Sequence, residues 1–155
     1  MTGGAPDHPA RMIAHLSIGV RDLDAAVRFY NAVFAPLGYV SYGIVDGDPP
    51  HHPFRSCGFG PPGGDPWAIG DATPFWLEER PDAAPPTNGA HVCFSAPTRD
   101  QVHAFHAAGL QHGATDDGAP GPRPHYGEGY YAAFLIDPEG WKIEAVTYHA
   151  DRSGS

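Results

Sequence analysis

The chain has 155 residues, of which 41% are hydrophobic and 12% aromatic, which is enough to bury the core of one domain or of two small modules. Its formal net charge of −9 argues against nucleic acid or an anionic membrane as the main partner. The two cysteines form no CxxC pair, no signal-peptide pattern is visible, and no run approaches the roughly 18 apolar residues of a membrane span. We therefore expect a cytoplasmic protein that binds neither nucleic acid nor membrane.

Twenty glycines and 18 prolines predict many turns between strongly patterned segments. Apolar residues at helical spacing follow Asp22, a good N-cap, and also Thr98, which forms a capping box with Gln101. The first predicted helix ends at 36–38 and the second at Gly109. The predicted strands are 12–20, 39–45, 51–60, 67–69, 74–79, 91–96, 130–136 and 141–148.

Two connections in the second half of the chain have distinctive compositions. Residues 116–129 are rich in Gly and Pro and are expected to form a long loop that holds His125 and Tyr126. Loops of this length in a compact domain are often functional. Asp137-Pro138-Glu139-Gly140 has Pro and Gly where a hairpin turn favours them.

The pattern of the first strand and helix occurs a second time, 76 positions downstream. At this offset Ala14-His15 falls on Ala90-His91, and Asp24 falls on Asp100. Each half is therefore predicted to be a βαβββ module with one helix on one face of a small sheet. The predicted boundaries are a flexible tail at 1–11, the first module at 12–79, a linker at 80–88 and the second module at 89–148, together one domain at 12–148.

Three residues are candidates for a metal site. His15 and His91 open corresponding strands, and Glu144 lies in an apolar final strand where a carboxylate needs a reason. Two imidazoles and one carboxylate form a facial triad that suits Fe(II), Mn(II), Ni(II) or Zn(II) and leaves positions open for substrate. Each residue alone also has a structural explanation, as a satisfied histidine or an edge-strand carboxylate. Cys93 lies inside an apolar run and is expected to be buried.

Three segments resemble the vicinal oxygen chelate superfamily, also called the glyoxalase / bleomycin resistance / extradiol dioxygenase superfamily. They are Ile13–Leu23, Gly89–Val92 and Phe134–Glu144, and the Asp-Pro-Glu-Gly turn inside the third is the most specific local signal. The resemblance covers roughly residues 12–148. It implies an α+β fold in which two βαβββ modules form a U-shaped, barrel-like mixed sheet.

The resemblance implies that His15, His91 and Glu144 are the metal ligands. Glyoxalase I adds a fourth ligand from the last strand of its first module. Here the candidate is Glu78, because Trp76-Leu77-Glu78 parallels the pattern that ends at Glu144. The alternative is that Glu78 simply begins the polar linker.

The function implied by the resemblance is a metal-dependent enzyme that chelates vicinal oxygens of a small substrate, with a lyase or isomerase of the lactoylglutathione-lyase type favoured. The alternatives are an extradiol-type ring-cleaving dioxygenase and a metal-free ligand-binding protein like the bleomycin-resistance proteins. Nine Lys and Arg residues give a glutathione site little support. The predicted catalytic residues are Glu78, His125 and Tyr126, the cofactor is a divalent Fe, Mn, Ni or Zn ion, and the protein is expected to be a homodimer.

Overall fold

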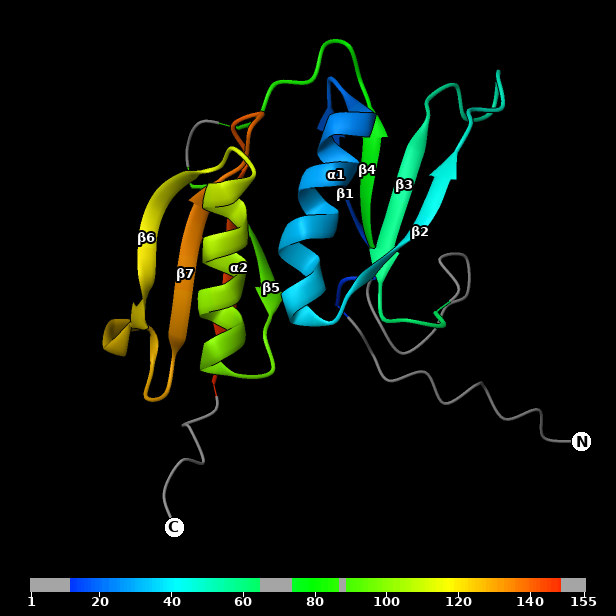
Figure 1. Cartoon of the computed structure of the whole chain (residues 1–155). Helices are drawn as coiled ribbons and strands as arrows, with labels where there is room; N and C mark the ends of the chain where they lie inside the picture. Colours follow the sequence, from blue (N-terminus) through cyan, green and yellow to red (C-terminus); the bar gives the residue numbers. More distant parts are fainter. Residues whose placement is uncertain (1–11, 65–73, 87–88, 149–155) are drawn as a thin grey trace, which may run out of the picture.

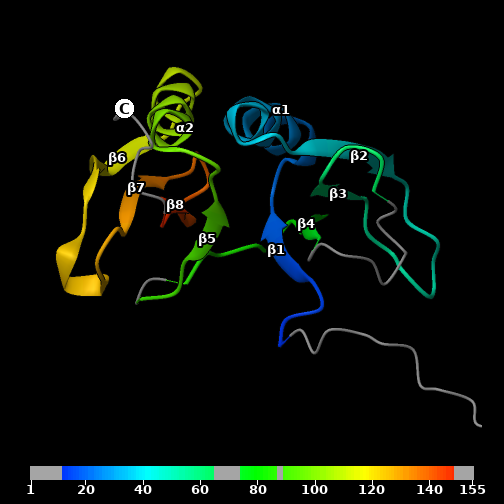
Figure 2. The same cartoon turned by 90° about the horizontal axis from the view of Figure 1, so that it is seen from below.

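The computed structural model describes residues 12–64, 74–86 and 89–148. Two helices run side by side, and the strands of both halves lie on the same side of them (Figures 1 and 2). Neither helix in this described part is long and apolar enough to cross a membrane. The elements are β1 (Leu16–Val20), α1 (Leu23–Phe34), η1 (Ala35–Leu37), β2 (Val40–Val45), β3 (Ser56–Gly60), β4 (Phe75–Glu79), β5 (Val92–Ser95), α2 (Arg99–Gln111), β6 (Thr115–Pro122), η2 (Pro124–Tyr126), β7 (Tyr131–Ile136) and β8 (Lys142–Thr147).

Each half of the chain forms a four-stranded mixed sheet of the same topology. The strand orders are β1-β4-β3-β2 in module 1 and β5-β8-β7-β6 in module 2. In each module the first strand pairs in parallel with the last, and the other pairs are antiparallel. This confirms the predicted α+β fold of two βαβββ modules. Because β1 and β5 are both edge strands, the two sheets present open edges to each other across the middle of the molecule.

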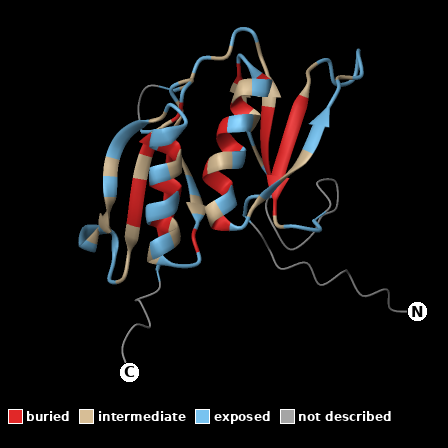
Figure 3. Ribbon diagram, in the orientation of Figure 1, coloured by how far each residue is buried: buried red, intermediate tan, exposed pale blue. Residues whose placement is uncertain are grey.

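The core lies between the helices and the sheets, where buried residues concentrate (Figure 3). Helix α1 begins after Asp22, whose side chain accepts a hydrogen bond from the backbone N–H of Ala25 at 2.9 Å. Its apolar stripe buries Phe29, Tyr30 and Phe34 against the sheet. Since the helices cover one face of each sheet, the opposite faces are left for a site.

The prediction of a long loop over 116–129 is wrong for most of that segment. It contains the greater part of β6 and the short helix η2. β6 is an edge strand whose pairing with β7 has two register shifts. An edge strand needs ladder hydrogen bonds on one side only, so Pro120 and Pro122 are tolerated there. Because the segment is rich in proline and glycine, its composition predicts a loop although it forms a strand.

The prediction that α2 ends at Gly109 is also wrong, because the helix continues to Gln111. A Cβ atom at position 109 would overlap the side chain of Leu135 on β7. The absence of a side chain at Gly109 therefore allows α2 to pack closely against β7. The glycine that follows the helix end is Gly113, whose φ of 98° favours glycine.

Replacing Gly109 by valine is expected to destabilise the protein by about 2 kcal/mol, because the new side chain must displace the fully buried Leu135. Urea unfolding measures the change. The control is Ala107→Val, which is exposed on the same helix and is expected to cost only about 0.5 kcal/mol of helix propensity. Equal losses in the two variants would contradict the packing explanation.

The predicted hairpin turn between β7 and β8 also joins the two modules. We call Asp137–Trp141 the inter-module turn. The two oxygens of the Glu139 carboxylate share the backbone N–H of Arg21, at 2.6 and 2.9 Å, and one of them also accepts a hydrogen bond from the Arg21 guanidinium at 3.1 Å. The Trp141 indole N–H donates to the backbone carbonyl of Gly19 at 3.0 Å. The start of α1 is therefore held by the other half of the chain.

A buried hydrogen bond lies beneath this surface contact. The Tyr30 hydroxyl, on α1, donates to Asp137 Oδ2 at 2.7 Å. The other oxygen of Asp137 accepts the backbone N–H groups of Glu139 and Trp141 at 2.9 and 2.8 Å. Asp137 therefore shapes its own turn and fastens that turn to module 1.

Candidate functional site

His91 and Glu144 lie together on the face of module 2 that no helix covers. His91 immediately precedes β5, and Glu144 pairs in register with Cys93 on the adjacent parallel strand β8. His91 Nε2 lies 3.0 Å from Glu144 Oε2. The Glu144 side chain is 2% exposed and the His91 side chain 37% exposed. The carboxylate is therefore buried, while the imidazole remains accessible.

Each ring nitrogen of His91 faces an oxygen atom. Its Nδ1 lies 3.3 Å from the backbone carbonyl of Gly89, which can only accept a hydrogen bond. Its Nε2 lies 3.0 Å from Glu144 Oε2, which also only accepts when it is ionised. A hydrogen on Nε2 satisfies this contact in the metal-free protein, and a metal ion can replace that hydrogen between the two atoms.

Tyr130 and Cys93 complete the surroundings of Glu144. The Tyr130 hydroxyl donates to Glu144 Oε1, the oxygen that His91 does not contact. Local desolvation, the hydrogen bond to Glu144 and the charge of this carboxylate raise the pKa of Tyr130 well above its usual range. Cys93 as a residue is exposed, yet desolvation around its thiol and the charge of Glu144 raise the pKa of that thiol well above its usual range too. Both groups therefore stay protonated at neutral pH.

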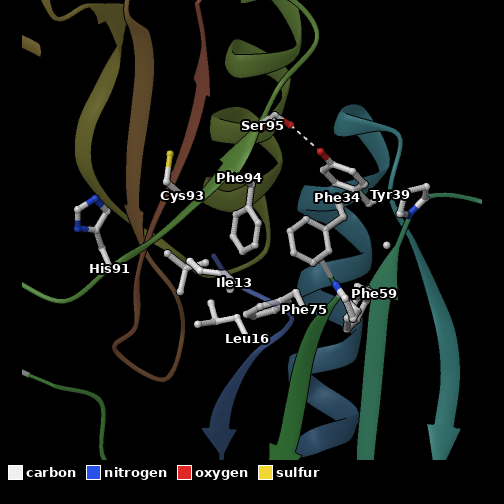
Figure 4. A pocket seen from close by; sticks show the side chains of 14 residues that line it. Ile13, Leu16, Phe34, Tyr39, Phe59, Phe75, His91, Cys93, Phe94 and Ser95 are labelled. Carbon is white, nitrogen blue, oxygen red and sulfur yellow. Dashed lines mark hydrogen bonds between the residues drawn. The ribbon is translucent and has the colours of Figure 1, made fainter. Parts of the chain in front are cut away.

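A cavity of about 790 Å³ lies between the edge strands of the two modules, with His91 in its wall (Figure 4). Its size is within the range of small-molecule sites. The described residues that line it are Ile13, Leu16, Phe34, Tyr39, Phe59, Gly60, Pro61, Pro74, Phe75, His91, Val92, Cys93, Phe94 and Ser95.

His15 immediately precedes β1 and is exposed. Among the described residues, no group of three or more His, Cys, Asp and Glu side chains is placed to hold a metal ion. Within one chain, the structure therefore brings together His91 and Glu144, and His15 does not join them.

The strand register corrects the alignment that nominated Glu78. Ser17 stands two residues after His15 and pairs with Trp76, as Cys93 pairs with Glu144. Trp76 therefore occupies the position in module 1 that corresponds to Glu144. Glu78 lies two residues further along β4, where its carboxylate accepts a hydrogen bond from Arg80 at 3.0 Å. Its role as a ligand or base stays a prediction.

His125 and Tyr126 lie on η2, where Tyr126 is 62% exposed. The Tyr126 ring packs against the Tyr130 ring with centroids 5.3 Å apart, and the His125 ring packs against Tyr126 at 4.2 Å. These side chains thus form a row that leads from the surface to the hydroxyl that contacts Glu144.

Sequence reasoning missed Tyr130 and placed Cys93 in the core. The alternation of side chains along β5 could have corrected the prediction for Cys93, since residues 91 and 93 lie on the same face of the strand. Tyr130 had no such signal. It precedes β7, and its approach to Glu144 depends on the pairing of β7 with β8.

Solved structures of similar fold come from several organisms. A glyoxalase/bleomycin resistance protein from Albidiferax ferrireducens T118 is 30% identical with a TM-score of 0.65, over 88% of this chain and 98% of that one. Glyoxalase I from Zea mays is 21% identical with a TM-score of 0.62, over 87% of this chain and 45% of that one. The fosfomycin resistance protein FosX from Listeria monocytogenes, solved in complex with Mn(II) and sulfate, is 14% identical with a TM-score of 0.58, over 87% and 90%. At these identities the last two show similarity of fold.

The family of the chain is shown by a match between its sequence and a family profile. The comparison with curated proteins gives no match. The profile of the Glyoxalase/Bleomycin resistance protein/Dioxygenase superfamily matches residues 12–145, a region that includes both modules through Ala145. The chain therefore belongs to the Glyoxalase/Bleomycin resistance protein/Dioxygenase superfamily.

Proposed function

We propose that this protein is a divalent-metal enzyme that chelates vicinal oxygens of a small substrate, with His91 and Glu144 as protein ligands. The single observation that carries the proposal is the 3.0 Å separation of His91 Nε2 and Glu144 Oε2. Two ligand atoms that each lie about 2.1 Å from one metal ion, with a right angle at the ion, are about 3 Å apart. The pair therefore has the separation that two ligands of one ion require.

The surroundings of the pair are those of metal ligands. A ligating histidine usually donates its other ring N–H to a carbonyl or carboxylate, and here Nδ1 faces the carbonyl of Gly89. A ligating carboxylate is usually hydrogen-bonded in turn, and Tyr130 donates to its second oxygen. These contacts leave Nε2 and Oε2 as the atoms that would bind the ion.

We assign the third ligand to His15 of a second copy of the chain. His15 is exposed, and it does not join His91 and Glu144 within one chain. A homodimer in which module 1 of one copy faces module 2 of the other would supply it. The site would then be completed only by dimerisation.

A bound divalent ion acts as a Lewis acid that stabilises negative charge developing on a substrate oxygen. The residues of this chain orient the ligands and exclude water with the apolar cavity, and the Tyr130 hydroxyl donates a hydrogen bond to Glu144 Oε1. A lyase or isomerase and a ring-cleaving dioxygenase both begin from this chelation. Assays with a methylglyoxal–thiol adduct and with catechol, under each metal, separate these two reactions.

Metal content tests the proposal. Chelator-treated protein is dialysed against Fe(II), Mn(II), Ni(II) or Zn(II), and the bound metal is measured by elemental analysis. The wild-type protein is expected to hold about one ion per chain of at least one of these metals, and His91→Ala to lose it. The matched control is His51→Ala, an exposed histidine in the turn after β2, which is expected to keep the ion. Absence of bound metal in the wild type would overturn the proposal.

The second candidate is a metal-free ligand-binding protein. It is favoured by the apolar cavity and by the fact that, in the described part of one chain, no third candidate ligand joins His91 and Glu144. This candidate predicts that a ligand binds equally well to the wild type and to Glu144→Ala in the presence of a chelator, while no metal is retained by either.

Tyr130→Phe is expected to weaken metal affinity about 10- to 100-fold without changing the number of ions per chain, because it removes only the hydrogen bond that orients Glu144. Competition with a chromogenic chelator measures the affinity. The control is Tyr126→Phe, whose hydroxyl lies on an exposed residue, and its affinity should match the wild type. An unchanged affinity in Tyr130→Phe would show that this hydroxyl does not support a ligand.

A further inference from the structure

We infer that the cavity binds an uncharged aromatic ring system, which enters between the two modules with its oxygen substituents toward His91. The inference rests on the proposed function for the role of those oxygens, and it names the substrate class that the proposal leaves open. The class follows from the aromatic surface of the cavity, its charge and the position of its polar groups.

The first observation is a cluster of aromatic rings at the floor of the cavity. Phe34 and Phe94 have ring centroids 4.7 Å apart, and Phe75 lies 5.1 Å from Phe94 and 5.7 Å from Phe34. The three interplanar angles are 79°, 82° and 88°, so the rings stand edge to face. A further flat ring can join such a cluster at favourable edge-to-face or offset geometry.

The cluster joins the modules, since Phe34 and Phe75 belong to module 1 and Phe94 to module 2. Tyr39 spans the same junction, with its hydroxyl donating to the backbone carbonyl of Ser95 at 3.1 Å (Figure 4). The floor of the cavity is therefore held from both sides. A ligand that rests on it contacts both modules at once.

The second observation concerns charge. Among the described residues that line the cavity there is no Lys, Arg, Asp or Glu. Transfer of an anionic group to such surroundings costs the free energy of its hydration without a paired cation in return. A glutathione conjugate, which carries carboxylates, is therefore a poor match, whereas an uncharged ring loses little when it is desolvated.

The third observation is the distribution of polar groups. His91 and Cys93 lie along one side of β5, whereas the aromatic cluster with Phe94 lies on the other side (Figure 4). β5 is an edge strand, so a ligand can extend past it from the aromatic floor to the imidazole. The ligand is therefore oriented, with its ring on the phenylalanines and its oxygens toward His91, the candidate metal ligand that lines the cavity.

Binding to the metal-free protein tests this inference separately from the metal site. 2-Naphthol, an uncharged ring with one oxygen, and S-hexylglutathione, an anionic thiol conjugate, are titrated by calorimetry in the presence of a chelator. The wild type is expected to bind 2-naphthol at least tenfold more tightly than S-hexylglutathione. Phe94→Ala is expected to weaken 2-naphthol binding at least tenfold. The matched control Phe54→Ala removes a phenylalanine that packs under Arg80 outside the cavity, and it should leave binding within twofold of the wild type.

Ile13→Asp tests the inference without removing a side chain that packs in the core. Ile13 lines the cavity and is 50% exposed, so aspartate there adds a charge with little effect on folding. It is expected to weaken 2-naphthol binding at least tenfold. Equal binding in the wild type and Ile13→Asp, or tighter binding of S-hexylglutathione, would overturn the inference. A protein that holds no metal but binds 2-naphthol as described would refute the proposed function and leave the aromatic site standing.

Discussion

Glu144→Gln is expected to lower the affinity for divalent metal at least about a hundredfold, beyond the loss typical of an outer-shell change. The same substitution is expected to raise the free energy of unfolding of the metal-free protein by about 1–2 kcal/mol. Opposite effects on binding and stability distinguish a residue kept for its chemistry from one kept for the fold.

Both effects follow from the burial of the carboxylate. Its side chain is 2% exposed, and in the described part of the chain the residue that forms an ion-pair contact with it is His91. A charge in such a place costs desolvation free energy that an amide of the same shape does not. Glutamine still accepts the Tyr130 hydrogen bond, but it lacks the negative charge that holds a divalent ion.

Urea unfolding with a chelator measures the stability, and competition with a chromogenic chelator measures the affinity. Glu79→Gln is a suitable control, because Glu79 lies on the corresponding last strand of module 1 and pairs with Arg55 at 2.9 Å near the surface. It is expected to leave metal affinity unchanged. A destabilised Glu144→Gln that keeps its metal affinity would show that Glu144 is a structural residue.

Asp137→Ala is expected to destabilise the protein by about 3–4 kcal/mol. The substitution removes three hydrogen-bond acceptor contacts and leaves the hydroxyl of Tyr30 without its partner. Tyr30 is 0% exposed, so water cannot replace the lost oxygen. The loss also frees the turn that fastens module 2 to the start of α1.

Asp137→Asn separates hydrogen bonding from charge. Burial raises the pKa of Asp137 above its ordinary value, although the hydrogen bonds from Tyr30 and the turn oppose this. A raised pKa means that this group favours the folded state most below about pH 4, and that this contribution is lost as the pH rises through the folded-state pKa. Asparagine keeps one acceptor oxygen and has no such titration. It should therefore cost far less than alanine and flatten the pH dependence of stability above pH 4.

Thermal and urea unfolding between pH 4 and 8 test both substitutions. Asp117→Ala is the control, because Asp117 forms a surface ion pair with Lys142 and should change stability by less than about 1 kcal/mol. A loss in Asp137→Ala no larger than in this control would contradict the role given to the inter-module turn.

The sequence predicted features that local pattern determines. The helices, the two βαβββ modules and the turn at 137–140 follow from apolar spacing, caps and turn residues, and the structure contains them. The proximity of His91 and Glu144 could also be predicted, because the resemblance implies which strand each residue occupies. β6 was missed because an edge strand tolerates the prolines that normally mark a loop.

Features that depend on strand register or on the packing of the two modules could not be predicted from local sequence pattern. Glu78 and Trp76 differ by two residues, so both point to the same face of β4, and alternation cannot decide which of them corresponds to Glu144. The separation of His15 from His91 depends on how the modules are arranged, which no local pattern encodes.

A mixed dimer tests most directly the claim that His91 and Glu144 of one copy and His15 of another hold one ion. His15→Ala and Glu144→Ala chains with different affinity tags are refolded together, and the doubly tagged species is purified for elemental analysis. We predict one ion per mixed dimer, with two in the wild-type dimer and none in either parent, because only one of the two shared sites is then intact. A mixed dimer without metal, or a His15→Ala parent that keeps its metal, would contradict the shared site.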